Sequence, residues 1–146
     1  SYDHNSLTIS DNKPMAGETN LVKLLKTMNP ALQEGDYVFC TTDNPEKINL
    51  KDIVLFFKEK ECYTLILRKE RSDQLGLEYS FVASWITLNV NSSLEAVGFT
   101  AAFSQALAGE NIRCNVVSGF FHDHLFVGRK ERDKAVKILK QLSGQA

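Results

Sequence analysis

The residues of this chain that are best suited to chemistry are two histidines that flank an aspartate, His122-Asp123-His124. In an extended strand both imidazoles would share one face and Asp123 the other. Two imidazoles can bind a metal, but a stable site needs a third or fourth ligand, and the nearby sequence offers none. A His–Asp pair can do acid–base work, but no serine or cysteine lies in a nucleophile motif. We therefore expect no metal and no catalytic residue, and a hydrogen-bonding, packing or ligand-contact role for both histidines.

A second group of polar side chains gathers at Asn89, Asn91, Ser92 and Ser93. The group lies where an expected strand meets an expected helix. Unpaired N–H groups and the dipole of a helix N-terminus favour a bound carboxylate by about 0.3–1 kcal/mol. The alternative is that Ser92 only caps the helix, with Glu95 completing a capping box, while the asparagines shape the turn. The residues by themselves leave both interpretations open.

The elements that must position these groups follow from hydrophobic periodicity in the second half of the chain. Alternation of apolar and polar residues predicts strands over 85–90, 112–117 and 124–127. Apolar residues at helical spacing predict a helix over 94–109. A final helix carries one apolar stripe on a charged cylinder, formed by Ala135, Ile138, Leu139 and Leu142. This β-α-β-β-α order is five-sixths of a ferredoxin-like βαββαβ unit. The helix 94–109 is apolar on most sides, so both its own sheet and either the N-terminal half or another subunit must cover it.

The first half gives a degraded version of the same order. The pattern predicts a helix from Leu21 that Thr19 or Asn20 caps and Asn29-Pro30 ends. It then predicts a strand 37–42, an ambiguous segment 47–52, a hairpin of strands 53–57 and 63–67, and a helix 69–75 ending at Gly76. The missing last strand could only come from 79–90, which also opens the second half. We expect a tail over 1–14, modules over 15–78 and 79–146, and one integrated body.

Composition excludes several classes of function. A net charge of −1, without a long run of like charge, gives no basis for binding nucleic acid. No segment is apolar enough to span a membrane. The three cysteines, Cys40, Cys62 and Cys114, are too widely spaced for a disulfide framework or zinc site and fit a reducing, cytoplasmic setting. The glycines form no phosphate-binding loop, and we expect no cofactor.

Several segments of the chain together resemble a known family. They are Gly17-Glu18-Thr19-Asn20-Leu21, Gly35-Asp36-Tyr37-Val38-Phe39-Cys40, Trp85-Ile86-Thr87-Leu88, Ser92-Ser93-Leu94-Glu95-Ala96-Val97-Gly98, Cys114-Asn115-Val116-Val117-Ser118-Gly119 and His122-Asp123-His124-Leu125-Phe126-Val127. With these the chain resembles bacterial ACT-domain proteins, and more narrowly the small tandem-ACT proteins of uncharacterised function.

The resemblance implies βαββαβ modules that pair side by side and bind amino acids or similar metabolites for regulation. It places the ligand near the loop Asn89–Leu94, at a module interface. We also expect Asn115, His122 and His124 to contact the ligand. The loop departs from the usual family pattern, because Asn91-Ser92-Ser93 replaces the acidic residue, proline and glycine often found there.

The sequence thus predicts an α+β protein of two ferredoxin-like, ACT-like pseudo-repeats packed into one body, with antiparallel sheets and helices on one face. It predicts a non-catalytic regulatory protein that binds an amino acid or related carboxylate and forms a homo-oligomer. One alternative is an interaction module without a ligand. The other is a metal-dependent or hydrolytic enzyme that uses His122 and His124.

Overall fold

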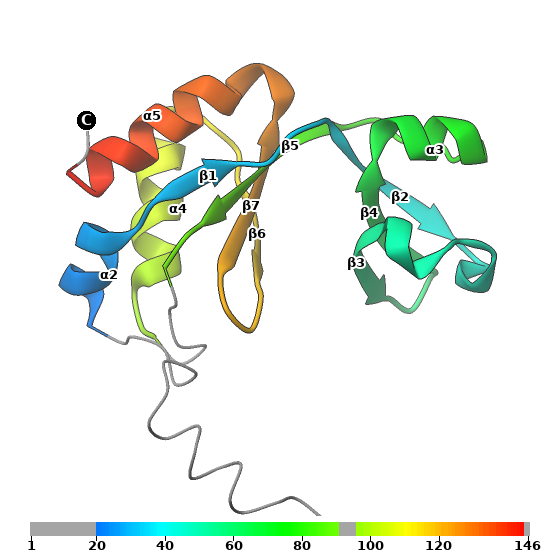
Figure 1. Ribbon diagram of the computed structural model, residues 1–146, viewed down its shortest axis with the longest axis horizontal. Coiled ribbons are helices and arrows are strands. Elements are labelled where there is room, and N and C mark those ends of the chain that lie inside the picture. The colour runs from blue at the N-terminus through cyan, green and yellow to red at the C-terminus, as the bar shows by residue number, and fades with distance from the viewer. Residues whose placement is uncertain (1–19, 91–95, 145–146) are drawn as a thin grey trace, which may run out of the picture.

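The computed structural model describes residues 20–90 and 96–144 (Figure 1). Its helices and strands, in chain order, are α2 (Leu21–Thr27), β1 (Pro30–Leu32), β2 (Tyr37–Thr42), β3 (Ile53–Lys58), β4 (Tyr63–Arg68), α3 (Lys69–Leu75), β5 (Val82–Leu88), α4 (Phe99–Gly109), β6 (Asn115–Ser118), β7 (Asp123–Gly128) and α5 (Arg132–Leu142). Short 3₁₀ turns lie at Pro45–Lys47, Leu50–Asp52 and Arg129–Glu131. The described part of the chain contains no helix long and apolar enough to cross a membrane.

All seven strands join one antiparallel sheet in the order β3-β4-β2-β5-β7-β6, with β1 beside β5. Strand β5 serves both halves of the molecule. Its first residues pair with β2, with Ala83 opposite Tyr37, whereas its later residues pair with β1, with Leu88 opposite Pro30. Along its other edge β5 pairs with β7. The strand that the sequence predicted to be shared therefore closes the N-terminal set of strands and opens the C-terminal set.

Strand β1 supplies the strand that the C-terminal half lacks. It lies antiparallel to β5 on the edge away from β7, which is the position of the last strand in a βαββαβ unit. Backbone bonds extend the pairing at both ends, from Gln33 N–H to the Trp85 carbonyl and from Asn89 N–H to the Asn29 carbonyl, both at 2.8 Å. The sequence analysis missed this strand because it has only three residues and starts with proline, which sheets accept at a first position.

Helix α2 provides the second cover that the apolar helix α4 needs. The α2 side chain of Leu24 and the following Met28 are both fully buried. They share one core with residues of β5, α4 and α5, namely Ile86, Leu88, Phe99, Phe103, Leu107, Ala135 and Leu139. The sequence left open whether the N-terminal half or another subunit provides this second cover, and in the structure the N-terminal half provides it. Figure 1 shows α2 and β1 lying against the C-terminal half, away from β3 and β4.

The predicted start of the helix 94–109 was wrong. Strand β5 ends at Leu88, and α4 begins at Phe99 rather than Leu94. Gly98 precedes the helix in a left-handed conformation with φ of +88°, which a right-handed helix cannot continue through. The proposed capping box of Ser92 and Glu95 lies outside the described residues.

The helices share one face of the sheet, as predicted. In β5, Ile86 and Leu88 point toward α4 and α5. In the N-terminal strands, α3 and the 3₁₀ turns cover the core that holds Val38, Cys40, Leu65 and Leu67, and Val82 of β5 packs against it. Because Val82, Ile86 and Leu88 alternate with the other β5 residues, these cores lie on the same side. The opposite side, here called the helix-free face, carries a cluster with Tyr37, Phe39, Trp85 and Phe126.

Candidate functional site

His124 lies at the centre of a polar network on the helix-free face. The Trp85 indole Nε1–H donates to His124 Nδ1 at 3.0 Å, and Thr87 Oγ1 lies 3.1 Å from the same nitrogen. Thr87 Oγ1 also accepts a 2.9 Å bond from the Gln33 amide. Because an indole N–H can only donate, Nδ1 accepts, and the neutral ring carries its proton on Nε2. Burial lowers the pKa of His124, the neighbouring His122 lowers it further, and Asp123 partly opposes them.

His122, in the β6–β7 hairpin, lies next to the start of the predicted ligand loop. Its Nδ1 lies 3.3 Å from the Val90 carbonyl oxygen, and its ring centroid is 6.4 Å from that of His124. Asp123 is buried and accepts a 2.5 Å hydrogen bond from the Ser118 hydroxyl. Asn89 is exposed at the end of β5. Four other predicted ligand residues, Asn91, Ser92, Ser93 and Leu94, lie outside the described residues.

Asn115 lies apart from the histidines. It is at the far end of β6, opposite Phe126, whose carbonyl oxygen accepts a 3.3 Å hydrogen bond from the Asn115 amide. It lines a separate hollow of about 330 Å³ with Phe39, Phe81 and Arg113, here called the aromatic cavity. The structure therefore gathers Asn89, His122 and His124 near one end of β5 and places Asn115 elsewhere. Within residues 20–90 and 96–144, no three His, Cys, Asp or Glu side chains are arranged to hold a metal ion.

A larger cavity, of about 460 Å³, lies where the chain bends between β1 and β2. We call it the junction cavity. Its lining comes from the bend, β2, the β3 region, the end of β4, α3 and β5: Gln33, Tyr37, Lys51, Asp52, Val54, Arg68, Glu70, Arg71, Gln74 and Trp85. Two of these residues, Gln33 and Trp85, also hold His124 in its network. The cavity is thus built on the shared strand and reaches both halves of the molecule.

The charges of the junction cavity are only partly paired. Arg71 Nε donates to Asp52 at 2.9 Å, which satisfies that pair. The guanidinium of Arg68 lies 5.7 Å from the centre of the Tyr37 ring. Among the described residues, Arg68, Lys51 and Glu70 have no ion-pair partner. A cavity with an unpaired guanidinium and an unpaired carboxylate can bind a ligand that carries both charges.

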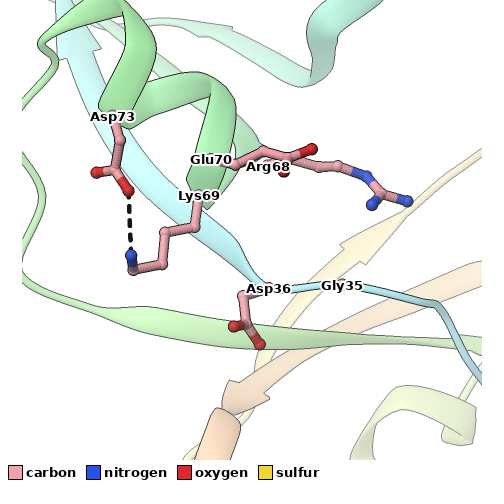
Figure 2. A pocket seen from close by; sticks show the side chains of 6 residues that line it. All are labelled: Gly35, Asp36, Arg68, Lys69, Glu70 and Asp73. Carbon is pink, nitrogen blue, oxygen red and sulfur yellow. Dashed lines mark hydrogen bonds and ion pairs between the residues drawn. The ribbon is translucent and has the colours of Figure 1, made fainter.

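A smaller hollow of about 310 Å³ adjoins it, and Arg68 and Glu70 line both. Figure 2 shows Lys69 and Asp73 facing each other across their ion pair, while Arg68 extends away from them. The Tyr79 hydroxyl donates to Asp73 at 2.6 Å, and this bond and the Lys69 ammonium lower the pKa of Asp73. Gly35 allows the bend, since its φ of +99° lies in a region that residues with a side chain rarely adopt. The unpaired Arg68 and Glu70 are therefore shared by the two hollows.

Sequence reasoning did not single out Gln33, Arg68 or Glu70. Arg68 and Glu70 belong to a charged run at the start of a correctly predicted helix, where such residues are usually solvated. Gln33 follows the strand that was not predicted and is far in sequence from its partner Thr87. The residues Glu34-Gly35-Asp36, which favour a turn before the strand 37–42, are a signal in the sequence at the place where these elements meet.

Comparison with known proteins gives the class to which this fold belongs. Two ACT-domain family models match the chain, one over residues 16–84 and one over residues 80–141. A Vibrio cholerae protein of unknown function, described as a possible transport protein, is 42% identical over 84% of this chain and 95% of its own, with a TM-score of 0.73. The chain therefore belongs to the ACT-domain family and carries two such domains in tandem.

More distant structures share the fold. An Agrobacterium tumefaciens protein is 18% identical over 80% of this chain and 89% of its own, with a TM-score of 0.61. The regulatory subunit of aspartate kinase from Thermus thermophilus is 7% identical over 80% of this chain and 98% of its own, with a TM-score of 0.58. No curated protein matches the chain.

Proposed function

We propose that this protein is a non-catalytic regulatory protein that binds a free amino acid or a related carboxylate in the junction cavity. ACT domains are typically regulatory, and the fold is shared with regulatory subunits of aspartate kinase, which supports the class of function. The observation that carries the proposal is the Arg68 guanidinium, which lines the cavity without a carboxylate partner among the described residues. We further propose that this regulation takes place in the cytoplasm.

The chemistry of the lining assigns a role to each end of the ligand. Arg68 is suited to bind the ligand carboxylate, because a guanidinium forms two parallel charge-assisted hydrogen bonds with it. Glu70, on the first turn of α3, is suited to bind the α-ammonium group. Tyr37 holds Arg68 through its ring, and Trp85 presents an aromatic surface to the ligand.

The net charge of the lining favours acidic ligands. Three cationic residues, Lys51, Arg68 and Arg71, and two acidic ones, Asp52 and Glu70, line the cavity, which leaves one excess positive charge. An amino acid with a second carboxylate complements this charge, whereas lysine or arginine as the ligand would bring a further cation. We therefore expect glutamate or aspartate to bind more tightly than the cationic amino acids.

The test is a thermal and fluorescence titration with each of the twenty amino acids. Trp85 is the only tryptophan of the chain, so a ligand in the junction cavity should change the intrinsic fluorescence. A ligand at about 100 times its dissociation constant should stabilise the protein by about 2.7 kcal/mol. Arg68→Gln should weaken binding by about tenfold or more, because a charge-assisted bond is lost. Arg132→Gln, on an exposed α5 arginine, is the matched control.

Two results would lead to different conclusions. If none of the twenty amino acids stabilises the wild-type protein, the proposed ligand class is wrong. If one of them binds and Arg68→Gln leaves its affinity unchanged, the ligand lies elsewhere. The loop 89–94 with His122 is then the next proposal, and Ser92→Ala, Ser93→Ala and His122→Ala variants test it.

A second candidate function is a protein interaction module that forms a homo-oligomer. The observation in its favour is a set of exposed phenylalanines on two hairpins, with Phe57 59% and Phe120 57% exposed. Strand β3 is at one edge of the sheet and β6 at the other, and edge strands can pair with another copy. Sedimentation of the wild-type protein and of a Phe57→Ser, Phe120→Ser variant tests it, and a monomer at high concentration would exclude self-association.

A further inference from the structure

The aromatic cavity lies on the helix-free face, where the two halves of the molecule meet. Phe39 comes from β2, Phe81 directly precedes β5, and Arg113 and Asn115 come from the edge at β6. Asn115 lies opposite Phe126, so their side chains share a sheet face. The volume of the aromatic cavity, about 330 Å³, is in the range of small-molecule sites. Two strands far apart in the sheet thus form its opposite walls.

Aromatic rings form the body of this cavity. The ring centroids of Phe39 and Phe81 are 5.9 Å apart, and that of Phe39 is 5.7 Å from the ring of Phe126. Phe126 is buried at 1% exposure, whereas Phe39 and Phe81 are only half-buried. An apolar group placed against these two rings would remove the rest of their surface from water.

The rim of the cavity carries a cation without an anion. Arg113 is exposed and, within the described part of the chain, has no carboxylate partner. Asn115 uses its Nδ2 on the Phe126 carbonyl oxygen. None of the four described residues that line the cavity is acidic, so the cavity has no partner for a ligand ammonium. In this it differs from the junction cavity, which has Glu70 and Asp52.

We propose that the aromatic cavity is a second binding site, for an apolar carboxylate that lacks an ammonium group. The ring or branched chain of the ligand packs against Phe39 and Phe81, and its carboxylate binds the Arg113 guanidinium. This site uses no residue of the junction cavity. Because Phe39 and Arg113 belong to different halves of the molecule, an occupied site links the two modules.

Calorimetric titration with 3-phenylpropionate tests the proposal on the full chain. This probe has a ring and a carboxylate but no amine. We expect saturable binding to the wild-type protein and a loss of about tenfold or more in Arg113→Gln. We expect unchanged affinity in Arg68→Gln and in the exposed control Arg132→Gln. Phenethylamine, which carries an ammonium in place of the carboxylate, should not bind.

Each other outcome argues against the site. The proposal is overturned if the wild-type protein shows no saturable binding, or if Arg113→Gln binds as well as wild type. It is also overturned if Arg68→Gln loses affinity as much as Arg113→Gln, because the probe would then occupy the junction cavity. Phe39→Leu, which keeps an apolar side chain, should weaken binding while the urea midpoint confirms that the variant is folded. If no amino acid binds in the junction cavity, the proposed function fails, but the 3-phenylpropionate titration still tests the aromatic cavity independently.

Discussion

If α2 is an integral part of the C-terminal core, removing the Leu24 side chain should destabilise the whole molecule. Leu24 is 0% exposed and packs with residues of β5, α4 and α5. Truncation to alanine removes three buried carbons, worth about 2.5 kcal/mol at about 0.8 kcal/mol each. The cavity left behind raises the total cost to about 3–4 kcal/mol, inside the range seen for buried leucines. This is a large share of the stability of an ordinary domain.

The assay is urea unfolding followed by far-UV circular dichroism and by Trp85 fluorescence. Val22→Ala is the matched control, because Val22 lies on the same helix and is 62% exposed. Its cost should stay within about 0.5 kcal/mol, since alanine also favours helix more than valine does. Equal midpoints for Leu24→Ala and Val22→Ala would refute the reasoning. They would mean that α2 rests on the C-terminal half without completing its core.

Two further predictions concern single polar groups on β5 and β7. Ser84 is fully buried, and among the described residues its hydroxyl has no hydrogen-bond partner; Ser84→Ala should therefore raise the free energy of unfolding by about 1 kcal/mol. A loss of stability in urea unfolding would show that the hydroxyl is satisfied. The pKa of His124 is lowered from its usual 6.5, so the unfolded chain binds its proton first as pH falls. Wild-type stability should then fall as pH decreases below about 6.5 and level off below the folded pKa, and His124→Gln should remove this component. Equal slopes for the two proteins between neutral and mildly acidic pH would contradict the assignment.

Local patterns made most elements predictable. The strand 37–42 and the helix 69–75 have the bounds that the sequence indicated, because their periodicity and their breakers are local. Gly76 ends that helix in the left-handed conformation that glycine accepts readily. Asn20 caps α2 by accepting from the Lys23 N–H, as its position suggested. The last helix likewise buries the predicted stripe through Ala135 and Leu139.

Local patterns failed where distant residues decide the conformation. The segment before α4 has helical periodicity, but the left-handed Gly98 delays the helix until Phe99. Strand β1 has no pattern of its own and exists because β5 offers it a free edge. The polar network likewise depends on Gln33, Thr87 and His124, which pair across three strands.

The sequence by itself determined the alternation of helices and strands and the resemblance to the ACT-domain family, and this resemblance implied helices on one face of the sheet. These depend on side-chain periods and short motifs, which a linear chain displays directly. Only the tertiary structure decided that residues 30–32 complete the C-terminal module and that α2 covers α4. It alone brought Arg68 and Trp85 into the lining of one cavity and Phe39 and Arg113 into the lining of another. The reason is that strand pairing joins residues by register and not by distance along the chain, so a site on a shared strand becomes visible only after both halves have paired with it.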